Sequence, residues 1–145
     1  MSNSAVAQPA FTLNAVENQT LTSSVALTGR FLIAGLFILS GLSKVAAPEA
    51  TISYIQSSGL PFATLGYLGA VAVELGAATA LLVGFQTRLV ATVMAVFTLV
   101  TAFAFHAHFG DQNQFIHFFK NISIVGGLLQ VAAFGGGRFS LDARN

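Results

Sequence analysis

The sequence has no cysteine and no tryptophan, and charged residues make up only 8% of its 145 positions. Without cysteine the chain forms no disulfide, offers no thiol nucleophile and supplies no thiolate ligand to zinc or to an iron–sulfur cluster. A soluble domain carries about 25% charged residues, so the composition argues against a soluble protein. The net charge of +1 and the lack of a basic run give no indication of nucleic-acid binding.

Apolar residues make up 54% of the chain and are gathered in four long stretches. A membrane-spanning helix needs about 20 mostly apolar residues, and each stretch meets this requirement. The connection at 48–63 predicts a short amphipathic helix that Gly59 and Pro61 end. We therefore predict a single all-α domain at residues 25–137, an integral membrane four-helix bundle with spans at 26–47, 64–85, 88–109 and 115–136.

Both ends of the chain are polar. Residues 1–24 lack the basic start and apolar core of a signal peptide, so we expect a mobile tail there and a second polar tail at 138–145. Loops on the cytoplasmic side of a membrane carry an excess of lysine and arginine. Cytoplasmic termini would place four cations on the inner side and two on the outer side, namely Arg30, Arg88, Arg138 and Arg144 against Lys44 and Lys120. This distribution predicts that both termini are cytoplasmic.

Glu74 is the single charged residue inside the second span. A charge at the centre of a bilayer costs roughly 2.5–3.5 kcal/mol and normally faces other helices, where it finds a partner. Small residues share its helix face and would let another helix approach closely: Gly66, Ala70, Ala77 and Ala78. Two interpretations stay open, a structural ion pair or hydrogen-bonded carboxyl, and a group that handles protons or binds a ligand.

Other polar side chains are expected near Glu74. With a rise of about 1.5 Å per residue, Lys44, His106 and Lys120 each lie roughly 9–11 Å from the centres of their helices, all towards the outer face. We predict a pocket that opens outward, with Glu74 at its floor and the stem of Lys120 long enough to reach it. Asn121 is expected to form hydrogen bonds across helices.

The histidines differ in expected position. His106 and His108 lie about 200° apart on a helix, so at most one faces the pocket, and His106 continues the face of the small residues before it. His108 and His117 are expected at the outer boundary of the membrane. A haem or metal ion joining His106 to His117 is conceivable, but no diagnostic spacing supports it, so we predict no metal site and disfavour haem.

Five segments, taken in order and spacing, resemble the DoxX family of small bacterial membrane proteins: GRFLIAGLFILSGLSKV, SSGLP, ELGAATALLVGFQTR, IHFFKNISIVGG and GGGRFSLD. The resemblance covers about residues 28–142. Seven polar residues fall on the family pattern, namely Arg30, Lys44, Glu74, Arg88, His106, Lys120 and Asn121, whereas His108 and His117 do not. The resemblance implies a four-helix protein of the bacterial inner membrane, linked to quinol or thiosulfate:quinone oxidoreductases and to oxidative stress, in complexes with redox partners.

The resemblance and the polar pocket together favour a membrane redox subunit that presents a quinone site. Glu74 would accept a proton, His106 and Lys120 would bind a quinone oxygen, and Arg30 and Lys44 would balance charge at the two ends, with Arg88 as a boundary anchor. The identity of any bound cofactor stays open. Two rivals remain, a carrier or channel for a small anion or acid and a non-catalytic scaffold. The exposed small-residue faces would also permit self-association.

Overall fold

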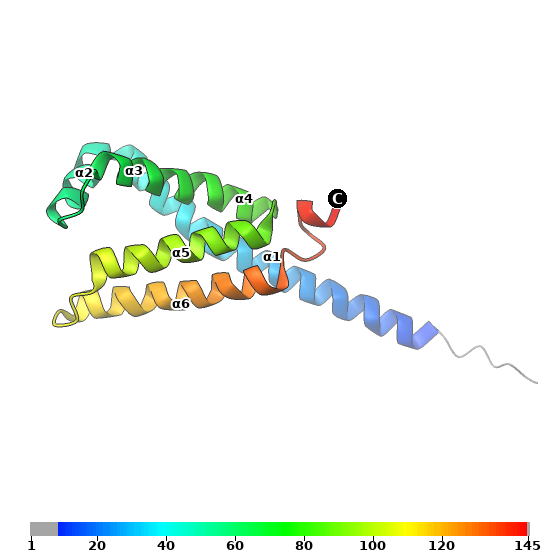
Figure 1. The fold of residues 1–145 in the computed structure, drawn as a ribbon. Helices are drawn as coiled ribbons and strands as arrows, with labels where there is room; N and C mark the ends of the chain where they lie inside the picture. The colour runs from blue at the N-terminus through cyan, green and yellow to red at the C-terminus, as the bar shows by residue number, and fades with distance from the viewer. Residues whose placement is uncertain (1–8, 145) are drawn as a thin grey trace, which may run out of the picture.

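The computed structural model describes the backbone of residues 9–144 and the side chains of residues 18–144. This part of the chain is mostly helical, with short turns between the helices, and contains no strand. Figure 1 shows the long helices side by side, with both chain ends at the same end of the bundle. In order, the elements are α1 (Pro9–Ala46), α2 (Pro48–Ser57), α3 (Ala63–Val71), η1 (Ala72–Ala77), α4 (Ala78–Val83), α5 (Thr87–His106), α6 (Gln112–Phe134) and η2 (Leu141–Arg144).

Four helical segments are long and apolar enough to cross a membrane, which confirms the predicted spans. They are Asn18–Ala46, Ala63–Val83, Thr87–His106 and Gln112–Phe134. The second of these is continuous although it passes through three elements, α3, η1 and α4. The predicted amphipathic connection is also present as α2. This helix ends at Ser57, shortly before Gly59, whose φ of 76° is left-handed.

The N-terminal segment differs from the expected mobile tail, because α1 already begins at Pro9. Hydroxyl side chains in its first described turns donate to carbonyls four residues earlier, such as Ser23 to Gln19 at 2.8 Å and Thr22 to Asn18 at 2.9 Å. These bonds satisfy the polar side chains within the helix, so a polar segment can continue the span. In Figure 1 this part of α1 projects beyond the other helices. The part of the predicted tail at 1–8 lies outside the described residues.

Small side chains let the helices pack closely in the half of the bundle nearer the termini. The core there combines residues of α1, α4, α5 and α6, and four of its eight members are alanines. Because lipid gives helices no hydrophobic reason to associate, close contact through small residues is the main source of packing energy. The members are Ala34, Phe37, Ala78, Leu81, Ala91, Met94, Ala95 and Leu128.

The polar C-terminal tail packs against the bundle. Helix α6 ends at Gly135, whose φ is 81°, and the chain folds back so that η2 lies against the start of α5. The Asp142 carboxylate accepts hydrogen bonds from the backbone N–H of Gln86 at 2.7 Å and of Thr87 at 2.8 Å. An acidic side chain at these free N–H groups acts as a helix cap, which holds the segment to the bundle.

Candidate functional site

Glu74 is buried, with 6% of its surface exposed, and its charge is neutralised by Lys44. The ammonium of Lys44 lies 3.0 Å from Oε1 and 2.9 Å from Oε2 of Glu74, and it also donates to Ser40 Oγ at 2.9 Å. The prediction that Lys120 reaches Glu74 is wrong. Lys44, which was expected near the pocket and as a balancing charge at the end of the first span, is the partner.

Two local features bring Lys44 and Glu74 together. Gly41, one turn before Lys44, lies so close to the second span that a Cβ atom there would stand 3.1 Å from Glu74 Cβ and 2.7 Å from Leu75 Cδ2. Glu74 itself sits in the π-helical turn η1, an irregularity that is common at functional sites and changes which residues face a neighbouring helix. Gly41 permits α1 to approach the second span closely, and the π turn η1 carries the Glu74 carboxylate at this contact.

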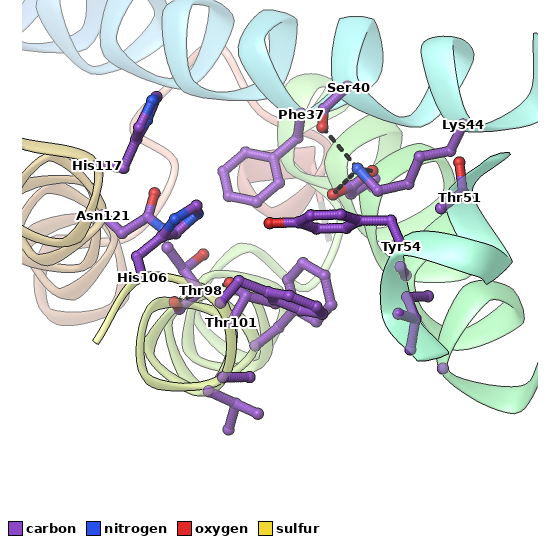
Figure 2. Close-up of a pocket in the computed structure, with 18 of the residues that line it drawn as sticks. Phe37, Ser40, Lys44, Thr51, Tyr54, Thr98, Thr101, His106, His117 and Asn121 are labelled. Atoms are coloured by element: carbon purple, nitrogen blue, oxygen red, sulfur yellow. Dashed lines mark hydrogen bonds and ion pairs between the residues drawn. The ribbon is translucent and has the colours of Figure 1, made fainter. Parts of the chain in front are cut away.

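A pocket of about 480 Å³ extends from this ion pair between α1, α2, α3, α5 and α6. Its walls are largely apolar and include the rings of Phe37, Tyr54, Phe97 and Phe105, and Figure 2 shows Phe37 and Tyr54 beside the ion pair. The Tyr54 ring stacks on Phe105 of α5, with centroids 5.5 Å apart and an interplanar angle of 20°. Phe97 completes the aromatic part of the wall. The pocket can therefore hold a flat apolar ring.

The far side of the pocket carries a second polar group, contributed by α5 and α6. His106 Nδ1 lies 2.8 Å from Gln114 Oε1, and the Lys120 ammonium lies 3.1 Å from His117 Nδ1. The two imidazole rings stack, with centroids 5.2 Å apart. Asn121 lines the same side, and in Figure 2 the Tyr54 hydroxyl points across the pocket toward His106.

Five of the seven predicted site residues therefore border one pocket, namely Lys44, Glu74, His106, Lys120 and Asn121. Arg30 and Arg88 lie at the opposite end of the bundle. Arg30 is fully buried and donates to the carbonyls of Leu81 at 3.1 Å, Leu82 at 3.3 Å and Phe139 at 2.6 Å. It joins α1 to the end of α4 and to the C-terminal segment. Arg88 lines a separate hollow beside Gly135.

Several pocket residues were not identified from the sequence. His117 was expected at the membrane boundary, yet it borders the pocket and stacks on His106. Its spacing of three residues from Lys120 places both on one helix face, which is the signal that could have found it. Tyr54 borders the pocket, and Gln114 contacts His106 without lining the pocket itself. Neither carries a comparable signal, because their positions depend on how α2 and the α5–α6 turn fold over the bundle.

No candidate metal site is present among residues 18–144, since no three or more His, Cys, Asp or Glu side chains gather there. The Nδ1 atoms of both stacked histidines are already engaged, one by Gln114 and the other by Lys120.

Comparison with known proteins gives two kinds of match. The sequence model of the DoxX family matches residues 25–107. The chain is 38% identical over 116 residues to the inner membrane protein YqjF of Escherichia coli K12, covering 80% of this chain and 88% of that protein. It is 36% identical over 124 residues to the inner membrane protein YphA of the same strain, covering 81% and 88%. No solved structure matches the chain significantly.

Proposed function

Since this chain belongs to the DoxX family and is a multi-pass protein of the inner membrane, we propose that it is the membrane subunit of a quinone-linked oxidoreductase system. Its pocket would bind the ring of a quinone or quinol. A redox partner protein would exchange electrons with the bound ring, because this chain has no cysteine to hold an iron–sulfur cluster.

The observation that carries this proposal is the arrangement of the pocket as an aromatic slot with a polar group at each side. The Lys44–Glu74 pair lies on one side, and His106 with Asn121 lies on the other. A quinone has the same pattern, a flat apolar ring with an oxygen at each of two opposite edges. A small inorganic anion would make no use of the stacked Tyr54 and Phe105 rings.

Glu74 can serve as a proton acceptor for one quinol hydroxyl. The Lys44 ammonium donates to Oε1 at 3.0 Å and lies 2.9 Å from the buried Oε2, and no other group in the described part of the chain donates a hydrogen bond to Oε2. A buried oxygen of this kind favours a ligand hydroxyl that can donate to it. Oxidation of the quinol would release two electrons to the redox partner and two protons to the pocket, one of them to Glu74.

Lys120 and Asn121 would act on the opposite side as hydrogen-bond donors to the other quinone oxygen. Both border the pocket, and the Lys120 ammonium keeps donor capacity beyond its contact with His117. Donors to a quinone oxygen stabilise the negative charge that develops there during reduction.

Quinone co-purification tests the proposal. The wild type, Glu74→Gln and Glu49→Gln are purified in mild detergent, extracted with organic solvent and assayed for quinone per chain. Glu49 is an exposed carboxylate of α2 and serves as the matched control. We expect near-stoichiometric quinone in the wild type and in Glu49→Gln, and a large loss in Glu74→Gln.

Background quinone in all three proteins would contradict the proposal. Flux of a small acid into proteoliposomes, abolished by Glu74→Gln, would then identify the pocket as the binding site of a carrier. Full partner binding and unchanged cellular activity in a folded Glu74→Gln variant would instead indicate a scaffold.

A further inference from the structure

The hydrogen bond between His106 and Gln114 fixes which nitrogen of His106 carries a proton. His106 Nδ1 lies 2.8 Å from the Gln114 side-chain oxygen, which can only accept. Nδ1 must therefore be the donor. In the neutral ring the other nitrogen, Nε2, then has no proton and presents a free lone pair.

His117 is held in the opposite form. Its Nδ1 lies 3.1 Å from the Lys120 ammonium, which can only donate, so Nδ1 accepts and Nε2 carries the proton. The two rings are stacked 5.2 Å apart, and two imidazolium ions at that distance would repel each other. The Lys120 ammonium occupies the lone pair of His117 Nδ1. Of the two stacked rings, His106 is therefore the one whose unprotonated nitrogen, Nε2, has no such contact.

The side chain of Gln114 is itself supported by the start of α6. Asp111 caps this helix by accepting from the Gln114 backbone N–H at 3.0 Å. The backbone from which the Gln114 side chain extends is therefore fixed, and the side chain is half-buried between α5 and α6. A hydrogen bond from such a position can select one tautomer of its histidine partner.

We propose that His106 Nε2 is the second proton acceptor of the pocket and that Gln114 is the positioning residue that keeps this atom unprotonated. The proposal rests on the quinol site described above and completes its proton balance. On oxidation, two electrons leave for the redox partner, one O–H bond breaks toward Glu74 Oε2, and the other breaks toward His106 Nε2 to give an imidazolium. The charged and titratable groups that border the same pocket are Lys44, Glu74, Tyr54, His117 and Lys120.

Nitrogen NMR tests the tautomers directly and needs no ligand. The chain has only three histidines, so protein labelled with ¹⁵N-histidine gives few signals, and His106→Gln, His108→Gln and His117→Gln each assign one ring. A ring nitrogen without a proton resonates far downfield of one with a proton. At neutral to mildly alkaline pH in nanodiscs, we expect the downfield nitrogen to be Nε2 in His106 and Nδ1 in His117.

Two substitutions at Gln114 test its role. Gln114→Glu keeps an oxygen acceptor at the same place and should keep the His106 tautomer. Gln114→Leu removes the acceptor, so His106 should populate the form with a proton on Nε2, and affinity for ubiquinol-1 should fall about tenfold, as expected for one lost hydrogen bond. Gln112→Leu, in the exposed turn before it, is the control and should change neither value.

The outcomes separate this inference from the quinone proposal. A protonated Nε2 in neutral wild-type His106, or an unchanged tautomer in Gln114→Leu, would overturn the inference even if quinone binds. Ubiquinol-1 that binds without moving the His106 Nε2 signal would overturn it as well. The expected tautomers without any binding of ubiquinol-1 or native quinone would overturn the assignment of His106 as acceptor together with the quinone site.

Discussion

Lys44 Nζ lies 3.0 Å from Oε1 and 2.9 Å from Oε2 of Glu74, so the charge inside the second span is neutralised by the last turn of the first. Removing one member of a buried pair leaves the other uncompensated and costs about 3–5 kcal/mol, whereas replacing both with apolar residues is close to neutral. We expect Lys44→Met to lower the free energy of unfolding by about 3 kcal/mol. The double variant Lys44→Met/Glu74→Met should recover most of the loss.

A double-mutant cycle by denaturant unfolding in detergent micelles checks this coupling. Glu74→Met alone should cost less than Lys44→Met alone, because the Lys44 side chain is 25% exposed and can turn toward solvent. Losses that simply add in the double variant would show that the two residues do not interact.

Gly84 occupies the one position where the second span, Arg30 and the C-terminal segment meet. Its φ is 74°, and a Cβ atom there would collide with the Arg30 guanidinium and Ser140 Cβ and would stand 2.8 Å from Ser140 Cα. Gly59 has a similar φ of 76° but open space around it, so it is the matched control. We expect Gly59→Ala to cost about 1–2 kcal/mol from the left-handed backbone alone.

Gly84→Ala should cost clearly more than Gly59→Ala, because it adds displacement of Arg30 and of the C-terminal segment to the same backbone strain. Thermal unfolding of both variants in one detergent measures the difference. Limited proteolysis should also release the C-terminal segment faster in Gly84→Ala than in the control. Equal losses of stability would contradict the packing around Gly84.

The membrane spans were predictable because long apolar runs in a chain with few charges leave few alternatives to a helical bundle. The gathering of Lys44, Glu74, His106 and Lys120 around one pocket was also predictable, since the helical rise sets position along each span. The partner of Glu74 was not predictable from the sequence. Lys44 and Lys120 have similar expected depths, so the choice between them depends on the rotation of each helix about its axis, which the π turn around Glu74 alters.

The C-terminal segment was unpredictable for a different reason. Its residues indicate only a polar tail, because their partners are backbone groups that only the folded bundle presents. Asp142 caps α5, and its own N–H donates to the Gly84 carbonyl at 3.0 Å. Such bonds depend on tertiary placement and leave no periodic signal in the sequence.

The same cap predicts a pH dependence of stability. The hydroxyl and backbone N–H of Thr87, together with the N–H of Gln86, lower the pKa of Asp142 from its ordinary value of 3.8. A lowered pKa means that the contribution to stability is fully present above about pH 3.8 and is lost as the pH falls through the folded-state pKa. At neutral pH, Asp142→Asn should lower Tm by roughly 2–4 °C.

The measurement compares the Tm of the wild type and of Asp142→Asn from pH 7 down to pH 3. Because asparagine does not titrate, the difference between the two proteins should be constant at the upper end and should shrink below about pH 3.8. A difference that stays constant through the acidic range would show that the charge of Asp142 does not stabilise the cap.

Tyr54 allows the ring and the hydroxyl contributions to quinone binding to be separated. Its ring stacks on Phe105, and its hydroxyl points across the pocket toward His106. Tyr54→Ala should lower quinone content strongly, since it removes an aromatic wall, whereas Tyr54→Phe should cost only a fewfold loss. Phe62→Ala, at a side chain 78% exposed, is the control for loss of an aromatic ring. Normal quinone content in Tyr54→Ala would exclude this wall from the binding site.

The absence of native cysteine makes the orientation of the bundle directly testable, because a single introduced thiol gives no background. Asn113 is exposed in the first turn of α6, at the pocket end, and Ala143 is exposed in η2, at the end where both termini lie. The excess of arginine near the termini predicts that this end faces the cytoplasm. A membrane-impermeant maleimide should therefore label Asn113→Cys in spheroplasts, and Ala143→Cys only after the membrane is permeabilised. The reverse labelling pattern would show that the bundle has the opposite orientation. The pocket would then open toward the cytoplasm, where a soluble redox partner would meet it from the inner side.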